Sequence, residues 1–490
     1  MIFVILSARL LEPISRFIRL FALHLEAKTM YKSTDFEQQQ ICFLHFNQSC
    51  GLQLDMNNEW VKRANQLPWA AWESQYSAMF PTTTGNVAKP CRMVMGSLII
   101  QMRMGFTDRE LVKQIQENPY YQYFIGLEEF KHTPPFAPTL LVEWRKRINV
   151  DFIVKANDAL GDAMPQIKGK SFGARIKGTL VATDICDATV APQNIRYPQD
   201  TSLLNESRVK LEAMVDSICE TNGLKKPRMY RKVAHAEYLD FAKSKKPGKE
   251  KIKRTIKHQL GYVNRDLKLL DGLLQSGYEL DKKFTDNLAT IRIVYQQQKY
   301  MFENDTHKVE NRVVSISQPY VRPVVRGKAN KPTEFGAKLH LSVDERGFAR
   351  IEHLSFDPYN EGPMLIQALE AYKYRNGCYP ERVLVDQIYR TTENIAFCKK
   401  NSIRISGPKL GRPTKDKKKR DKEAKIAAQD NVDRIQIERF FSTAKRRNGL
   451  GLITKKREDT SLSTVAMSIL VTNIFGSFKL AVEELEKEAE

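Results

Sequence analysis

Alternating hydrophobic and polar positions predict a β-hairpin in the C-terminal half of the chain. Along residues 337–343, Ala337, Leu339, Leu341 and Val343 alternate with polar partners, which is the period of a half-buried strand. The turn DERG then leads into FARIEHLSF, so we expect a second strand to return beside the first.

Apolar runs without alternation predict further strands that are buried on both faces. The segment GTLVATDICDATV (178–190) is rich in β-formers and lies between Gly and Pro. ERVLVD (381–386) and IRIS (403–406) are shorter runs of the same kind.

Helical patterns lie between these strands. Asn360 and Pro363 open one helix, which Gly377 ends. TTENIAFCKKN (391–401) is a second helix, and RIQIERFFSTAKRRNGLG (434–451) is a third with its cap. The basic stretch before that third helix, PKLGRPTKDKKKRDKEAK, is interpreted as a mobile loop. The predicted order is strand, long insertion, hairpin, helix, strand, helix, strand, helix.

The N-terminal part of the chain contains two predicted helices joined by a turn at Gly105. Thr107 and Glu110 form a capping box at the start of the second helix, and Asn118-Pro119 ends it. This pattern resembles a helix-turn-helix, which seats a helix in the major groove of DNA. An ordinary helical hairpin fits the pattern equally well.

The segment 201–330 is helical in pattern and strongly basic. Between Leu224 and Leu270, 15 Lys or Arg residues stand against 4 acidic residues. Such runs are often solvated faces, but a cluster this dense favours contact with phosphates.

Composition agrees with a polyanionic partner. The 490 residues carry a formal net charge of +21, with 42% hydrophobic and 28% charged residues, which is typical of a globular protein that binds nucleic acid or an anionic membrane surface. The seven cysteines form no CxxC pair and no cluster with zinc-ligand spacing, which indicates reduced thiols in a cytosolic protein.

Two apolar segments are candidates for membrane or targeting segments. The run Ile2 to Leu6 is short and lacks a preceding basic region, and charged residues interrupt the next part of the chain, which argues against a signal peptide and a membrane span. Residues 1–29 are either an amphipathic surface helix or a leader preceding a true start at Met30. STVAMSILVTNIFGSFKLAV (463–482) is expected to be a buried core helix because it contains Ser, Thr and Asn.

Three carboxylates fall on separate predicted elements. Asp187 lies in the first strand, Asp386 at the end of a later strand, and Glu438 on a late helix among five basic residues. Carboxylate oxygens are ligands that Mg²⁺ prefers, and two ions about 3.5–4 Å apart can clamp both oxygens of a phosphoryl displacement. Asp184 is a rival for the first position, but a strand directs it to the face opposite Asp187.

Glu438 shares one helix face with two cations. At 100° per residue, Arg434, Glu438 and Lys445 lie within about 40° of one another. This face would combine a metal-binding carboxylate with two groups that bind phosphate.

These features resemble the ribonuclease-H-like catalytic domain of the DDE transposases of bacterial insertion sequences, in the branch related to insertion sequence five. The resemblance rests on three stretches: DATVAPQNIRYPQDTSLLNESR (187–208), VDQIYRTTENIAFCKKNSIRISGPKLGRP (385–413) and RIQIERFFSTAKRRNGLGLI (434–453). SLIIQMRMGFTDRELVKQIQENPYYQYFIGLEEF is similar to the N-terminal domain of that branch.

The resemblance implies an α/β fold, a mixed sheet flanked by helices, with an all-α N-terminal domain and a long helical basic insertion. It implies that Asp187, Asp386 and Glu438 are the catalytic and metal-binding residues, with two Mg²⁺ ions that Mn²⁺ can replace. Of the family signature Tyr-x2-Arg-x3-Glu-x6-Lys, the tyrosine is missing, because Asn431 stands in its place. The expected DNA-binding residues are Arg434, Lys445, Arg446, Arg447, Tyr389 and Arg390; for Tyr389 and Arg390 the alternative is packing and a surface charge.

The predicted domains are a leader (1–29), a helical DNA-binding domain (30–150), a catalytic domain (171–200 and 331–476) and the basic insertion (201–330). The implied function is a cytoplasmic, nucleoid-associated transposase without membrane contact. It would bind its element's terminal inverted repeats as a homodimer, cut DNA and join the ends to target DNA. The alternatives are a structure-selective nuclease on the same fold and a domesticated, non-catalytic DNA-binding regulator.

Overall fold

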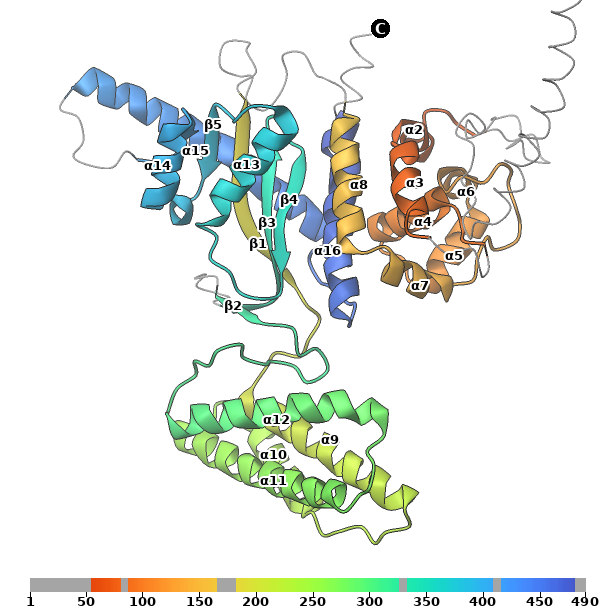
Figure 1. Cartoon of the computed structure of the whole chain (residues 1–490), viewed down its shortest axis with the longest axis vertical. Coiled ribbons are helices and arrows are strands. Elements are labelled where there is room, and N and C mark those ends of the chain that lie inside the picture. Colours follow the sequence, from red (N-terminus) through yellow and green to blue (C-terminus); the bar gives the residue numbers. More distant parts are fainter. Residues whose placement is uncertain (1–53, 81–86, 165–181, 326–332, 409–415, 481–490) are drawn as a thin grey trace, which may run out of the picture.

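The computed structural model of the chain describes residues 54–80, 87–164, 182–325, 333–408 and 416–480 (Figure 1). The leader at residues 1–29 and the first residues of the predicted strand 178–190 lie outside these ranges.

One mixed sheet forms the centre of the molecule. Its strands are β1 (Thr183–Pro192), β2 (Pro323–Val325), β3 (Thr333–Asp344), β4 (Ala349–Ser355), β5 (Arg382–Val385) and β6 (Arg404–Ile405). The order is β2-β3-β1-β5-β6, with β4 also paired to β3. β3 runs antiparallel to β1 and β4, whereas β5 is parallel to both β1 and β6. The predicted hairpin and the predicted mixed sheet are confirmed.

Helices cover both faces of this sheet. The strand residues Cys186, Val383 and Val385 pack against α13 (Met364–Asn376) and α14 (Thr392–Lys400). On the other face, Ile185 and Leu384 pack with α15 (Lys417–Arg447) and α16 (Glu458–Ile474). The alternation along each strand separates these two cores, as the pleat requires.

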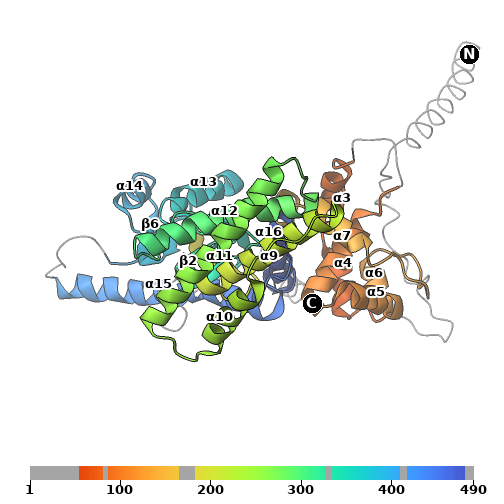
Figure 2. The same ribbon diagram turned by 90° about the horizontal axis from the view of Figure 1, so that it is seen from below.

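Helix α15 is longer than the sequence predicted. The expected mobile loop is helical from Lys417 onward, and Asp416 caps it by accepting hydrogen bonds from the backbone N–H groups of Lys418 and Lys419. The interpretation as a loop was wrong here because no Pro or Gly interrupts the chain between Pro413 and Gly449. In Figure 2 the N-terminal half of α15 extends away from the sheet, on the side opposite the N-terminal helices.

The N-terminal helices pack on α16 rather than directly on the sheet's centre (Figure 1). They are α2 (Glu59–Gln66), α3 (Trp69–Ser77), α4 (Cys91–Met104), α5 (Asp108–Glu117), α6 (Pro119–Phe124), α7 (Leu140–Arg147) and α8 (Val150–Asp162). Ala466, Met467 and Leu470 of α16 belong to their hydrophobic core. The helical stretch Glu458–Leu480, which begins with α16, is long and apolar enough to cross a membrane, but 72% of its most apolar part is buried inside the protein, as expected of a core helix.

The predicted helical hairpin is present in this region. Helix α4 ends at Gly105, which has a φ of 74°, and both hydrogen bonds of the capping box between Thr107 and Glu110 are formed. Residues 91–100 of α4 are buried. Helix α5 contains three acidic and two basic residues, a poor match to phosphate, so DNA reading by this hairpin remains a hypothesis.

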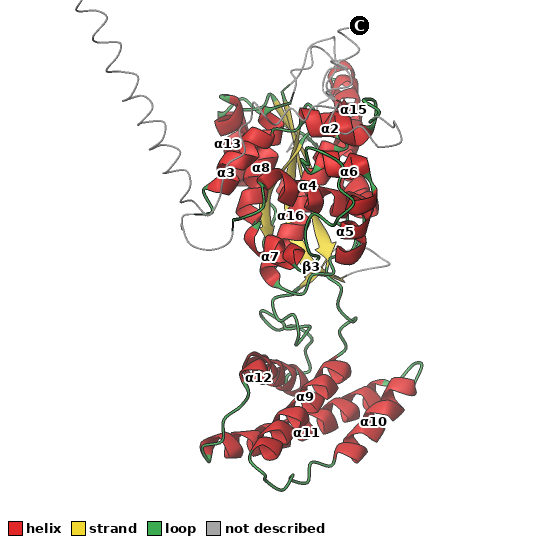
Figure 3. Cartoon of the chain, turned by 90° about the vertical axis from the view of Figure 1, so that its right-hand side faces the viewer, coloured by secondary structure: helices red, strands yellow, loops and turns green. Residues whose placement is uncertain are grey.

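The segment between β1 and β2 forms a separate helical unit, called the insertion below. It contains α9 (Asp200–Thr221), α10 (Arg231–Lys243), α11 (Lys249–Gln275) and α12 (Lys282–Glu303), which share a hydrophobic core of their own. Figure 3 shows these helices beyond one end of the sheet, joined to it by two extended segments. The carboxyl end of β1 therefore points toward the insertion.

Candidate active site

The register of the sheet brings two of the predicted acids together. Cys186 of β1 pairs with Val385 of the parallel strand β5, so the next residue of each strand, Asp187 and Asp386, lies beside the other. Neighbouring strands are about 4.8 Å apart. Asp187 is half-buried within the sheet, and Asp386 is exposed at the end of its strand.

Glu438 reaches the same place from α15. Ile437 and Phe441 of this helix are buried against the sheet, which directs the intervening residue Glu438 to the edge of that contact. Asp187, Asp386 and Glu438 line one pocket of about 670 Å³, which we call the active-site pocket. Its other lining residues include Thr189, Glu361, Arg434, Ser442 and Lys445.

Ion pairs to the buried Asp430 and Asp433 fix α15 against the sheet. Arg382 of β5 lies 2.8 Å from Asp433 and 3.4 Å from Asp430. Arg404 of β6 donates two hydrogen bonds to Asp430, at 2.5 and 2.8 Å. These contacts set the rotation of the helix one turn before Glu438.

The predicted cations flank the carboxylates. Arg434 lies 3.5 Å from Glu438, and the Lys445 ammonium donates a 2.9 Å hydrogen bond to the Thr189 hydroxyl. One oxygen of Asp187 accepts from the N–H of the next residue, and one of Asp386 does likewise, both at 2.8 Å. Backbone groups therefore hold two of the carboxylates in place.

The chemistry of the lining residues fits a hard divalent cation. Four carboxylates, from Asp187, Glu361, Asp386 and Glu438, line the active-site pocket without a thiol or an imidazole among the lining residues, a donor set that suits Mg²⁺ or Mn²⁺. Within the described ranges, no three His, Cys, Asp or Glu side chains are close enough together to hold a metal ion. Here Glu438 faces Arg434 instead.

Asp184, the rival for the first position, lies on the opposite face of β1. It is buried, outside the active-site pocket, and accepts a 3.5 Å hydrogen bond from the Cys186 thiol. Burial and the neighbouring Glu352 raise the pKa of Asp184 well above its usual range. The alternation of the strand thus directs only Asp187 toward Asp386.

Tyr389 has no exposed surface with which to contact a nucleotide in this arrangement, so its role in DNA binding stays a hypothesis. It is fully buried and stacks on His340, with ring centroids 5.6 Å apart and an interplanar angle of 23°. Arg390 donates hydrogen bonds to the carbonyl groups of Ser406 and Pro408. The alternative expectation for Tyr389, packing inside the protein, therefore describes its position.

Arg446 and Arg447 lie at the C-terminal end of α15, exposed and outside the active-site pocket. Their proposed contact with DNA therefore concerns the surface beside the pocket.

Glu361 is a pocket residue that the sequence analysis did not single out. It is largely buried and lies 2.9 Å from the Lys338 ammonium, which also donates to the Tyr359 carbonyl at 2.8 Å. In the sequence it is visible only as part of the helix start after Asn360. Its place in the pocket results from the fold, which returns this helix start to the carboxyl end of β1.

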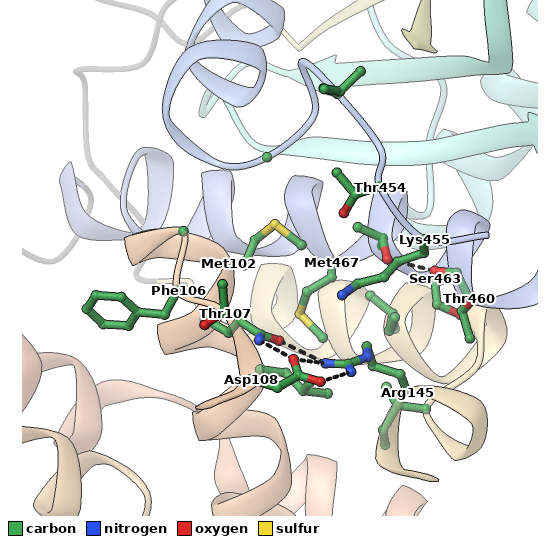
Figure 4. A pocket seen from close by; sticks show the side chains of 18 residues that line it. Met102, Phe106, Thr107, Asp108, Arg145, Thr454, Lys455, Thr460, Ser463 and Met467 are labelled. Atoms are coloured by element: carbon green, nitrogen blue, oxygen red, sulfur yellow. Dashed lines mark hydrogen bonds and ion pairs between the residues drawn. The ribbon is translucent and has the colours of Figure 1, made fainter. Parts of the chain in front are cut away.

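A separate pocket of about 540 Å³ lies between the α4–α5 turn and the segment after α15 (Figure 4). Arg145 and Asp108 form an ion pair there at 2.5 Å, with Lys455 nearby. Burial and Arg145 lower the pKa of Lys455. The turn of the helical hairpin thus lines a hollow together with the segment after α15 and with α16.

Two parts of the chain match models of known protein families. Residues 383–475 match the family model described as a transposase DDE domain, and residues 48–147 match the model described as a transposase domain (DUF772). The first match contains Asp386 and Glu438. An uncharacterized protein, ORF8 in the nfe locus of Rhizobium meliloti, is 26% identical over 174 residues, 36% of this chain and 79% of that protein. No solved structure matches.

Proposed function

We propose that the chain, whose residues 383–475 match a transposase DDE domain, binds the terminal inverted repeats of a mobile element, cuts DNA there and joins the ends to target DNA. The observation that carries this proposal is the active-site pocket, which Asp187, Asp386 and Glu438 line together with Arg434 and Lys445. This arrangement offers carboxylates for a cation and cations for a phosphate.

We assign the metal to the three carboxylates. Asp187, Asp386 and Glu438 would hold two Mg²⁺ ions, which Mn²⁺ could replace. A bound divalent ion supplies Lewis-acid chemistry, which lowers the pKa of an attacking water or 3′-hydroxyl and stabilises the leaving oxygen. The family generally uses divalent metal ions.

The protein's own groups position the DNA in this proposal. Arg434 and Lys445 bind the phosphate that is cut, while the exposed Arg446 and Arg447 bind the backbone beside it. Arg434 lies 3.5 Å from Glu438, and it would be free to contact the phosphate if Glu438 held a cation. Glu361, held by Lys338, closes the pocket on the side of α13.

The remaining parts of the chain would bind the longer DNA segments. We assign the terminal repeats to the helical domain of residues 30–150 and to the insertion of residues 201–330. Cutting two ends together requires at least a dimer on DNA. Such a protein would act in the cytoplasm, on the nucleoid.

A joining assay tests this function against its nuclease alternative. Purified protein is incubated with Mg²⁺ or Mn²⁺, a labelled duplex carrying the element's end, and supercoiled target plasmid. A transposase transfers the label to the plasmid. A nuclease only shortens the labelled duplex, and a non-catalytic regulator binds the duplex without changing it.

A further inference from the structure

A second cleft adjoins the active-site pocket. It measures about 870 Å³ and lies between the β2–β3 pair and the segment that leaves α12. Val325 of β2 lines both this cleft and the active-site pocket, so the two hollows lie next to each other at β2. We call the second hollow the tyrosine cleft.

Two tyrosines line the tyrosine cleft with much of their surface exposed. Tyr197 is 70% exposed and contacts Phe335 edge to face, with ring centroids 5.6 Å apart. Tyr300 of α12 is 53% exposed. Large aromatic side chains are usually buried, and exposed ones in a cleft offer flat faces on which a base can stack.

The polar lining of the cleft favours an anion. His307, Lys308 and Arg312 line it, against the single acid Glu310. Arg312 is held in place by Asp200 at 2.6 Å, and it donates to the His307 carbonyl at 3.1 Å. Lys308 is exposed at the rim.

We propose that the tyrosine cleft binds a single-stranded stretch of DNA that leaves the active-site pocket, with bases stacked on Tyr197 and Tyr300 and the backbone near Lys308. Base faces are accessible only in single strands, since a duplex stacks them on one another. The inference rests on the proposed function, which supplies the cut strand.

The sheet sets the distance between the two sites. The Gln193 N–H donates to the Phe335 carbonyl at 2.8 Å, so the contact partner of Tyr197 lies beside Gln193. That position is six residues beyond Asp187 in the sequence, or about 20 Å along a strand. At about 3.4 Å per nucleotide of a stacked strand, the stacked bases lie about six nucleotides from the cut phosphate.

Binding to oligonucleotides tests the cleft without any need for cleavage. Fluorescence anisotropy is measured with a labelled 20-nucleotide oligothymidine and with a 20-base-pair duplex, using the full chain. Tyr197→Ala and Tyr300→Ala are each expected to raise the Kd for the single strand about 5- to 150-fold. Tyr→Phe at either position keeps the affinity within about twofold, because the stacking face remains.

Matched controls separate stacking from other effects. Tyr374→Ala removes a tyrosine of α13 that is 91% exposed and lies outside the cleft, and it should leave both affinities unchanged. The cleft variants should also bind the duplex like wild type and melt at the same temperature. Wild-type affinity of both alanine variants for the single strand would overturn the proposal, as would an equal loss for the duplex.

The outcome is distinguishable from failure of the proposed function. If wild type joins DNA ends but the alanine variants bind single strands normally, the cleft assignment is wrong and the transposase function stands. If the tyrosines are needed for single-strand binding but wild type neither cuts nor joins DNA, the cleft stands and the catalytic function is wrong.

Discussion

Arg382 is ion-paired with Asp433 at 2.8 Å, and both side chains are almost fully buried. Arg382 also donates a 2.8 Å hydrogen bond to the hydroxyl of Thr183. It lies four residues before Asp386, while Thr183 lies four residues before Asp187 and Asp433 five residues before Glu438. A single guanidinium thus ties together the three elements that carry the proposed catalytic acids.

Replacing this guanidinium should loosen the site. In Arg382→Ala, Asp430 and Asp433 lose a buried partner, which costs about 3–5 kcal/mol for a broken buried ion pair. We expect faster amide hydrogen exchange in peptides covering β5 and the middle of α15, together with slower DNA nicking. Arg457→Ala, which removes an exposed partner of Asp459, is the control and should change neither. Unaltered exchange in Arg382→Ala would contradict the anchoring role.

Substitutions of Asp184 and of Asp187 should have different effects on DNA nicking. Asp187→Asn is expected to abolish nicking because it removes a proposed metal ligand. Asp184→Asn should retain nicking and should be at least as stable at neutral pH, because burial already favours the uncharged form of Asp184. Nicking rates and melting temperatures of the two variants check this. Loss of nicking in Asp184→Asn, with the fold intact, would reverse the assignment.

His340 should make stability depend on pH in the mildly acidic range. Burial lowers the pKa of His340 from 6.5 to about 4. Between these values the unfolded chain binds more protons than the folded one, so stability falls as the pH drops from about 6.5 to about 4, by about 3 kcal/mol in total. Urea unfolding of wild type and His340→Leu at several pH values should show this loss in wild type alone. The exposed His132→Gln should behave like wild type.

Tyr389 should tolerate loss of its hydroxyl. Within the described residues, that buried hydroxyl has no hydrogen-bond partner, so Tyr389→Phe should leave stability equal or higher and DNA affinity unchanged. Tyr389→Ala opens a cavity next to His340 and should cost about 3–5 kcal/mol. Thermal melting and DNA-binding titrations check both variants. Weaker DNA binding by a fully folded Tyr389→Phe would restore the direct contact that the packing argues against.

The sequence predicted the mixed sheet for identifiable reasons. The alternation of apolar and polar residues along 337–343 predicted β3. Gly377 predicted the end of α13, and in the structure this glycine has a φ of 73°, which favours glycine. Local patterns of this kind act over a few residues. Placing Asp187 beside Asp386 needed the order of the strands as well, which came from the resemblance to a family.

The features that the sequence did not predict depend on contacts between distant segments. Tyr389 is buried because His340, almost fifty residues earlier, stacks on it. Glu361 reaches the pocket through the return of α13 to β1, and Lys338 of β3 holds it there. The tyrosine cleft combines Tyr197, Tyr300 and Phe335, which lie far apart in the sequence. A local pattern of apolar and polar residues does not predict contacts between such distant residues.

The central claim is that Glu438 is a ligand for the metal that cuts DNA. Its most direct test is nicking of supercoiled plasmid with Mg²⁺ or Mn²⁺ by wild type, Glu438→Gln and Glu423→Gln, with DNA binding measured in parallel. Glu423 lies on the same helix outside the active-site pocket, so its substitution makes the same change of charge. We expect nicking by wild type and Glu423→Gln, none by Glu438→Gln, and similar DNA affinity for all three. Nicking by Glu438→Gln at the wild-type rate would contradict the central claim.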